Sequence, residues 1–202
     1  MVLVRHGQTE WARDGRHTGR TDVELTDTGR QQARDLGALL ADLLDGEPPA
    51  LALTSPLARA HRTAELAGLK ATSEPRLVEW DYGGYEGLTT PQIRAQAGPE
   101  WTVFEHGVVP GLTPGETLLE VATRARAVLE RVQPLLRNAD VVLVGHGHSL
   151  RVLAACWLGA EPQLGAQLLL DPAGIGVLGL SHDKPAVVHW NLRVAQRRQR
   201  WG

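Results

Sequence analysis

The sequence predicts an α/β fold, a three-layer α/β/α sandwich with a mostly parallel central sheet. Short aliphatic, β-branched runs are typical of buried strands, the amphipathic stretches between them are typical of helices, and the two kinds alternate along the chain. The 202 residues suffice for one sizeable hydrophobic core. We therefore expect one domain over residues 1–190, with a loop-rich cap at about 80–115, and then a basic C-terminal tail at 191–202.

Five apolar runs are the predicted strands. The first three are short, uninterrupted and rich in valine and leucine, which is the pattern of buried strands. The last two are interrupted by glycine or are only two residues long, so they are weaker signals of the same kind. The predicted strands are residues 2–4, 51–53, 141–144, 175–180 and 187–188.

Capping residues mark the starts of the helices in the first half of the chain. Thr26 can cap a helix whose leucines repeat at helical spacing up to Leu44. Ser55, followed by a proline at the first helical position, predicts a helix through Ala67. The cap is rich in glycine, proline and aromatic residues, so we expect loops there with one short helix from Thr90.

Two further helices are predicted in the second half. Thr113 and Glu116 match a capping box, in which the threonine side chain accepts from the third helical amide and the glutamate reaches back. The apolar stripe that follows over 118–132 predicts a helix that faces the core. Ser149 precedes a second amphipathic stretch, residues 150–158.

The composition excludes several classes of protein. A formal net charge of −2 gives no bias toward nucleic acid or an anionic membrane, and the apolar runs are too short to span a bilayer. The N-terminus lacks the features of a secretory signal. The single cysteine, Cys156, fits a reducing compartment, so we expect a cytoplasmic protein. A small-molecule substrate is the expected partner, and a homodimer is compatible with this composition.

Polar residues follow three of the predicted strands. The first strand runs into Arg5 and His6, the second leads to Arg59, and the third runs into His146. Each pattern alone is more typical of a surface turn or an exposed helix residue. In a parallel α/β sheet, however, the carboxyl ends of the strands share one edge, where ligands bind beside helix N-termini. Two arginines and two or three histidines, with His148 as the third, indicate a phosphate site at such an edge.

The motifs around these residues resemble the histidine phosphatase superfamily, also called phosphoglycerate mutase-like. They occur in the family's order and cover most of the chain. Within the family the chain is most similar to the small acid phosphatases and sugar-phosphate phosphatases that work without a cofactor. The matching segments are 3–11 (LVRHGQTEW), 19–29 (GRTDVELTDTG), 55–64 (SPLARAHRTA), 79–88 (EWDYGGYEGL) and 145–147 (GHG).

The resemblance implies a phosphatase that hydrolyses small phosphomonoesters through a phosphohistidine, with no metal and no cofactor. It implies that His6 is the nucleophile, that Arg5 and Arg59 clamp the phosphoryl oxygens, that His146 is a third phosphate ligand, and that Glu79 is the proton donor. The residues expected to contact the substrate are Arg5, Gln8, Thr18, Arg59, Glu79, Tyr82, His146 and Gly147.

One position departs from the family pattern. An asparagine often follows the tryptophan of the first motif, but this chain has Ala12 there. One hydrogen bond to the phosphate is therefore missing or comes from another group, for which Thr18 and Gln8 are the candidates.

The chemistry makes two demands on the site. His6 must be neutral to attack phosphorus, and neighbouring arginines disfavour its protonated form. Its other ring nitrogen must then be held as a donor, for which a backbone carbonyl is the expected partner. The leaving group needs a proton, and Glu79 is favoured because the rings of Trp80 and Tyr82 can shield it from water. Asp81 and Glu86 are the alternatives.

Three other functions compete with hydrolysis. A phosphoglycerate-type mutase would need a second phosphate site, yet Arg94 is the only lysine or arginine between residues 80 and 115. Arg13, Arg16 and Arg20 could still reach a second phosphate. A zinc site could use His146 and the histidine two residues later, although no third ligand lies at a suitable spacing. A binding module without catalysis is disfavoured, because all five expected reactive positions are present.

Aromatic side chains are concentrated in the cap. We expect them to shape the mouth of the pocket and to favour a partly apolar leaving group. The remaining histidines lack a place at a strand end and are expected to be structural or exposed. The residues expected at the mouth are Trp80, Tyr82, Tyr85, Trp101, Phe104 and His106, and the histidines set aside include His17, His61, His182 and His189.

Overall fold

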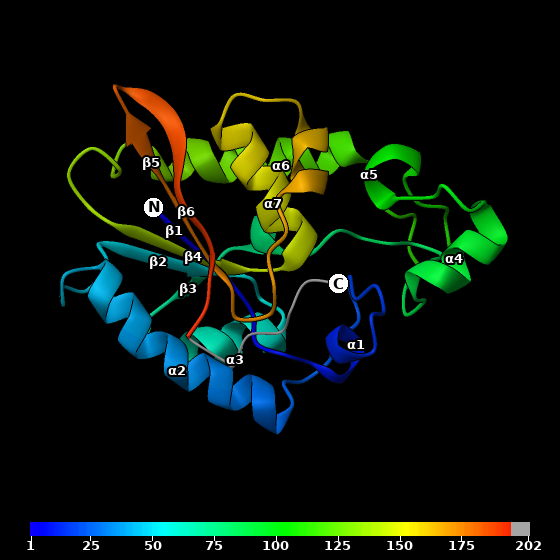
Figure 1. Cartoon of the computed structure of the whole chain (residues 1–202), viewed down its shortest axis with the longest axis horizontal. Helices are drawn as coiled ribbons and strands as arrows, with labels where there is room; N and C mark the ends of the chain where they lie inside the picture. Colours follow the sequence, from blue (N-terminus) through cyan, green and yellow to red (C-terminus); the bar gives the residue numbers. More distant parts are fainter. Residues whose placement is uncertain (195–202) are drawn as a thin grey trace.

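The computed structural model describes residues 1–194 and has a six-stranded sheet at its centre (Figure 1). The strand order is β3-β2-β4-β1-β5-β6, with parallel pairing from β3 through β1 and antiparallel pairing at β5 and β6. The sheet is therefore mixed, with its parallel part where the sequence predicts it. The strands are β1 (Val2–Arg5), β2 (Leu51–Thr54), β3 (Thr72–Ser73), β4 (Val141–Gly145), β5 (Ile175–Ser181) and β6 (Lys184–Leu192).

Helices cover both faces of the sheet, with α2 and α3 on one side and α6 and α7 on the other (Figure 1). The cap carries two short helices, α4 and α5, where one was expected. Two 3-10 turns, η1 and η2, complete the set. The helices are α1 (Glu10–Arg13), α2 (Asp27–Leu43), α3 (Ala58–Leu66), α4 (Thr90–Ala97), α5 (Val103–His106), α6 (Leu118–Val132) and α7 (Gly147–Trp157), and the turns are η1 (Pro75–Leu77) and η2 (Pro162–Gln167).

Alternating strand residues divide between two hydrophobic clusters. Leu3 and Leu143 pack with α6 and α7, whereas Val4 and Val144 pack with α2 and α3. Successive side chains of a strand point to opposite faces, so a run that is apolar throughout can be buried on both sides. This explains why the first three strands were visible in the sequence as uninterrupted apolar runs.

The predicted cap of α2 is confirmed, because the Thr26 side chain accepts a hydrogen bond from the Gly29 amide. Two other predicted caps are wrong. The α3 helix begins at Ala58 after Leu57, because Ser55 Oγ is engaged by a histidine from β4. The α6 helix is capped by a Thr117–Glu120 capping box, not by Thr113 and Glu116.

Two further boundaries differ from the prediction. The α7 helix begins at Gly147, directly after β4, so that Ser149 lies within its first turn. Strand β6 runs to Leu192, two residues into the predicted tail, and the next residue, Arg193, forms an ion pair with Asp171 at 3.0 Å. The rest of that tail, residues 195–202, lies outside the described residues. None of the described helices is both long and apolar enough to cross a bilayer.

Candidate active site

Neighbouring strands bring the predicted residues together at one edge of the sheet. β2, β4 and β1 are adjacent and parallel, so Ser55, His146 and His6, which follow them, meet at their carboxyl ends. The rings of His6 and His146 are 5.1 Å apart between centroids. His6 is only 4% exposed and His146 is fully buried.

The orientation of His6 is fixed by its own loop. Its Nδ1 lies 2.7 Å from the carbonyl oxygen of Gly7, which can only accept, so Nδ1 carries the proton and Nε2 holds the lone pair. This confirms the predicted carbonyl partner. Burial, followed by the charges of Arg59 and Arg5, holds the pKa of His6 well below its usual range. The ring is therefore neutral, with a nucleophilic nitrogen.

Close packing holds the loop that carries His6. A Cβ on Gly7 would lie 2.4 Å from the Gly29 carbonyl oxygen, so the loop can rest on the start of α2 only as glycine. The Gly7 amide also donates to Thr63 Oγ1 of α3 at 3.0 Å. The nucleophile is thus anchored to both helices on this face of the sheet.

Arg5 lies at the end of β1 with part of its guanidinium group unpaired. Its Nη1 donates to the Leu170 carbonyl at 2.6 Å. Its Nε is one of two buried side-chain polar atoms without a hydrogen bond among residues 1–194. A buried donor left unpaired costs about 1–3 kcal/mol, so this nitrogen favours an anionic acceptor beside it. A Cβ on Gly147 would lie 3.2 Å from Arg5 Cζ, so glycine leaves room for this contact.

Arg59 is fully buried on α3, and most of its donors are used in hydrogen bonds within the protein. Its guanidinium donates to the carbonyl oxygens of Thr18, Gly19 and Thr21 at 2.8–3.0 Å, and its Nε donates to His146 Nδ1 at 3.1 Å. An arginine has five N–H donors, so these four bonds leave one for a phosphoryl oxygen. Arg59 therefore positions the 18–21 loop and His146 in addition to carrying charge.

The hydrogen bonds of His146 define its tautomer. Because Arg59 can only donate, His146 Nδ1 must accept, and Nε2 carries the proton toward Ser55 Oγ at 2.7 Å. Burial and the charge of Arg59 hold the pKa of His146 well below its usual range. His146 is thus neutral beside His6, and its one N–H is engaged by Ser55 Oγ, so the predicted contact with a phosphate requires that N–H to leave the serine.

Glu79 is held at the N-terminus of α7. Its Oε1 accepts from the amides of Trp80 at 2.9 Å and Ser149 at 2.8 Å, and its Oε2 accepts from the His148 amide at 3.0 Å. The carboxyl group thus occupies the positive end of the helix that follows His146. It is 5% exposed, because backbone surrounds it on this side.

The two alternative acids, Asp81 and Glu86, accept hydrogen bonds from loop residues. Asp81 accepts from the Thr113 hydroxyl at 2.5 Å and from the Gly83 amide at 3.0 Å. Glu86 accepts from the amides of Gly19 and Thr21. Both carboxylates therefore stabilise the cap and the 18–21 loop. Glu79 instead lies at the N-terminus of α7, the helix that directly follows His146.

Of the further predicted substrate contacts, Gly147 and Gln8 are well placed. Gly147 opens α7, and within the described chain its amide makes no hydrogen bond. The Gln8 amide oxygen accepts from Thr26 Oγ1 at 3.0 Å, which leaves its NH2 group as a donor. The Thr18 hydroxyl instead donates to the Arg16 carbonyl at 3.2 Å. Gln8 is therefore the better substitute for the contact missing at Ala12.

The aromatic residues of the cap are not at the mouth. Trp80, Tyr82, Tyr85, Trp101 and Phe104 are each at most 7% exposed and belong to the core cluster beneath α6 and α7. The prediction that they line the entrance is wrong, because composition does not reveal which faces of a loop region are packed. His106 is exposed, and it lines a separate pocket with residues such as Pro114 and Pro162.

Sequence reasoning missed His17 and gave His148 no role of its own. His17 was set aside, yet its ring lies 6.0 Å from the ring of His148 and nearly parallel to it, at 10°. The Tyr82 hydroxyl, a predicted substrate contact, lies 2.5 Å from His148 Nδ1. The available signal was that His148 stands in the first turn of the helix after His146, so that its side chain projects near the site.

The described residues offer no set of zinc ligands. No three His, Cys, Asp or Glu side chains converge as a metal site in the part of the chain that the structure describes. His146 and His148 each accept a hydrogen bond at Nδ1 within the protein. The charge of the site therefore comes from arginines and a helix terminus.

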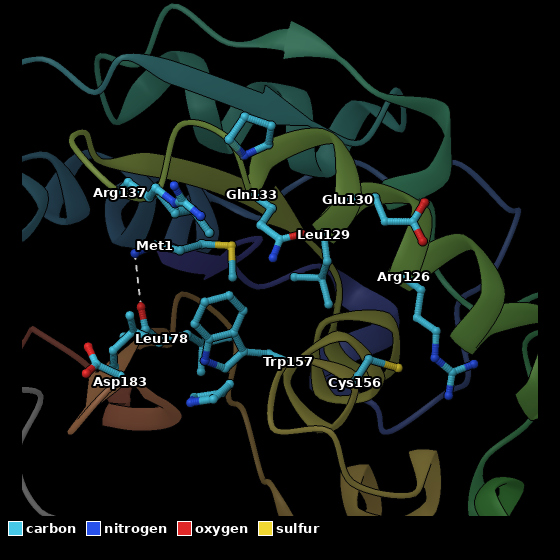
Figure 2. Close-up of a pocket in the computed structure, with 15 residues that line it drawn as sticks. Met1, Arg126, Leu129, Glu130, Gln133, Arg137, Cys156, Trp157, Leu178 and Asp183 are labelled. Atoms are coloured by element: carbon cyan, nitrogen blue, oxygen red, sulfur yellow. Dashed lines mark hydrogen bonds between the residues drawn. The ribbon is translucent and has the colours of Figure 1, made fainter.

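A large cavity lies elsewhere. It has a volume of about 1240 Å³ and lies between the ends of α6 and α7 and the β5–β6 hairpin, where the Met1 ammonium group donates to the Leu178 carbonyl (Figure 2). Cys156 and Trp157 also line it. It contains none of the predicted site residues, and we assign the chemistry to the sheet edge, where the neutral histidines and the arginines meet.

Comparisons with known proteins show which family this sequence and this fold resemble. The family model of the histidine phosphatase superfamily (branch 1) matches residues 1–193. An acid phosphatase of Mycobacterium tuberculosis is 42% identical over 183 residues, covering 90% of this chain and 87% of the relative. A 2,3-bisphosphoglycerate-dependent phosphoglycerate mutase of Azorhizobium caulinodans is 38% identical over 166 residues, covering 76% and 78%. The solved structure of the open reading frame Rv3214 from Mycobacterium tuberculosis has a TM-score of 0.88 at 40% identity, covering 95% of this chain and 96% of that one.

Proposed function

This chain belongs to branch 1 of the histidine phosphatase superfamily, and we propose that it hydrolyses small phosphomonoesters through a phosphohistidine on His6, without a metal. Besides the acid phosphatase, several relatives are named as phosphatases. The chain is accordingly a phosphoric monoester hydrolase of this family.

The tautomer of His6 carries the proposal. The Gly7 carbonyl holds Nδ1 as the protonated nitrogen, so Nε2 is the free nucleophile, and burial keeps the ring neutral. A neutral imidazole nitrogen attacks phosphorus well near pH 7. Within the described chain, Arg5 Nε and one N–H of Arg59 are left as donors for the phosphoryl oxygens, and His146 can add its N–H by exchanging Ser55 Oγ for an oxygen of the phosphate.

The reaction proceeds in two steps. His6 Nε2 attacks phosphorus, the bond to the leaving oxygen breaks, and Glu79 donates its proton to that oxygen as the alcohol departs. Water then attacks the phosphohistidine, Glu79 takes a proton from it, and the P–N bond breaks to release inorganic phosphate. In both steps the arginines and the Gly147 amide at the N-terminus of α7 stabilise the charge on the equatorial oxygens, which is the task that a metal ion performs in other phosphatases.

The mutase alternative is less supported. A mutase must hold a second phosphate, and the only cation between residues 80 and 115, Arg94, donates instead to the Trp101 carbonyl at 3.1 Å. Arg20 lies 3.9 Å from Asp81 and 3.7 Å from Glu116, so two carboxylates already oppose its charge. These contacts favour water as the acceptor of the phosphoryl group.

We also propose a cytoplasmic location. The chain has one cysteine, Cys156, and burial raises the pKa of its thiol. A protonated thiol of this kind is unreactive, which suits a protein that does not depend on disulfide chemistry.

Hydrolysis without a metal is expected to survive chelation. With excess EDTA, wild-type turnover should be unchanged, and inorganic phosphate should appear in step with the alcohol, with no need for 2,3-bisphosphoglycerate. Phosphate and alcohol are measured together over the same time course. Activity that is lost to the chelator and restored by zinc or magnesium would contradict metal independence, and isomerisation of 3-phosphoglycerate with little phosphate release would favour a mutase.

The role of Glu79 predicts a dependence on the leaving group. An alkoxide needs a proton in order to leave, whereas a nitrophenolate leaves well without one. Glu79→Gln should therefore slow phosphorylation by a sugar phosphate by about 10²-fold, and phosphorylation by nitrophenyl phosphate much less. Single-turnover rates measure this step, and Asp81→Asn and Glu86→Gln are the matched controls. A loss that depends on the leaving group in either control, with an equal loss for both substrates in Glu79→Gln, would transfer the acid role.

A further inference from the structure

We propose that the imidazoles of His17 and His148 form a leaving-group subsite that selects hydroxylated leaving groups, as in sugar and polyol phosphates, over carboxylated ones. The inference rests on the proposed phosphatase function and adds to it the residues that determine which alcohol is accepted.

Both histidines lie beside the proton donor and the phosphate clamp. The His148 amide donates to Glu79 Oε2 at 3.0 Å, so its side chain extends from the residue that anchors the acid. His17 directly precedes Thr18, whose carbonyl accepts from Arg59 at 3.0 Å. The two rings therefore face each other next to the point where the leaving group departs.

Hydrogen bonds fix a different tautomer in each ring. His17 Nδ1 lies 3.1 Å from the Leu88 carbonyl oxygen, which can only accept, so His17 Nε2 holds the lone pair. His148 Nδ1 lies 2.5 Å from the Tyr82 hydroxyl. Tyr82 is 2% exposed and has no other partner for its O–H group among residues 1–194, so its hydroxyl donates and His148 Nε2 carries the proton.

The two Nε2 atoms are accessible from outside. Neither makes a hydrogen bond within the described chain, yet neither belongs to the buried unpaired side-chain atoms there, which are Arg5 Nε and Ser149 Oγ. Neither atom is therefore fully enclosed, and together they offer one acceptor and one donor to a ligand.

Buried rings hold this arrangement in place. The Tyr82 and Trp101 rings meet the His17 ring edge-on at 4.9 and 5.5 Å, and the Phe104 ring meets the His148 ring at 5.4 Å. The aromatic residues of the cap thus act as a rigid support for the two imidazoles, which reduces the entropy that ligand binding would otherwise cost.

The chemistry of the pair matches a hydroxyl group. A hydroxyl both donates and accepts, so it can donate to His17 Nε2 and accept from His148 Nε2, or two neighbouring hydroxyls can divide these bonds. A carboxylate can only accept and would meet the lone pair of His17. Burial holds the pKa of His17 below its ordinary value and that of His148 well below, so neither ring offers the positive charge that would attract a carboxylate.

The variant His17→Phe tests the subsite. The phenylalanine keeps a ring for the aromatic contacts. The backbone amide of residue 17, which donates to the Leu88 carbonyl at 2.9 Å, is not changed by the substitution. The ratio of kcat/KM for a sugar phosphate to kcat/KM for nitrophenyl phosphate should fall about tenfold, the scale of one or two neutral hydrogen bonds. His148→Phe should lower the same ratio, and the preference for a sugar phosphate over 3-phosphoglycerate should shrink in both variants.

Exposed His61 on α3 provides the matched control, since His61→Phe should leave every ratio unchanged. An unchanged ratio in both subsite variants, or an equal loss for all substrates, would overturn the subsite. Such a result would leave the phosphatase function standing, because that function fails only if the wild-type protein does not turn over nitrophenyl phosphate.

Discussion

Replacing His6 with alanine is expected to lower kcat by about 10⁴-fold or more, the scale on which enzymes respond to the loss of a nucleophile. The arginines, His146 and Glu79 would remain, but no other nitrogen lone pair would face the phosphorus. The effect should be on kcat with little change in the affinity for inorganic phosphate, because the anion-binding donors are intact. The pH profile of the wild type follows from the same residue.

The acid limb of that profile should lie below the usual range of histidine. The pKa of His6 is lowered, so the neutral ring persists as the pH falls through 6.5, and activity is lost only under more acidic conditions. Steady-state rates of wild type, His6→Ala and the exposed control His61→Ala over a pH series measure both effects. Wild-type turnover in His6→Ala would show that another group is the nucleophile.

Replacing Arg59 with alanine is expected to lower kcat by about 10³-fold, because it removes a transition-state donor and disorganises the residues around it. Arg59 holds the carbonyls of Thr18 and Thr21 and the Nδ1 of His146. Without it, these acceptors lose their donor, as does the buried Gly19 carbonyl, and the contact that fixes the tautomer at His146 Nδ1 is lost. Stability should fall by about 1–3 kcal/mol for the same reason.

A control on the same helix separates these effects. Arg62 lies on the exposed side of α3 and, among residues 1–194, pairs only with Glu65, so Arg62→Ala should change neither activity nor stability appreciably. Arg59→Lys keeps the charge but not the planar fork, and should remain strongly impaired. Chemical denaturation and kcat are measured on all three. Near-normal activity in Arg59→Lys would mean that charge alone suffices.

The strands and the site edge could be predicted because their signals are local. The runs before Arg5 and Gly145 are apolar at every position, which is required of strands buried on both faces, and the chemistry follows directly where they end. The order β2-β4-β1 then brings Ser55, His146 and His6 together without any further information from the sequence.

The helix starts could not be predicted in the same way, since the capping side chains have partners far away in the sequence. Ser55 Oγ bonds to His146, and Thr113 Oγ1 donates to Asp81. Neither side chain caps the helix that its local motif predicts. Thr26 and Thr117 do cap their helices, and Thr26 does so while its hydroxyl also donates to Gln8, because a hydroxyl can donate and accept at once.

The same reasoning applies to the candidate site. His6, Arg59 and His146 follow strands and were visible, whereas His17 lies in a loop and acquires its place only through the Leu88 carbonyl and the ring of Tyr82. A tautomer depends on a partner that is distant in sequence, so no motif encodes it.

Trapping the covalent intermediate tests the central claim most directly. Wild-type protein is mixed with labelled nitrophenyl phosphate, quenched within the first turnover and digested, and the label is located by mass spectrometry. We expect base-stable, acid-labile phosphate on the peptide that contains His6, at Nε2, with no label in His6→Ala. Phosphate on a different residue, or a first turnover that yields inorganic phosphate with no labelled protein, would contradict the account.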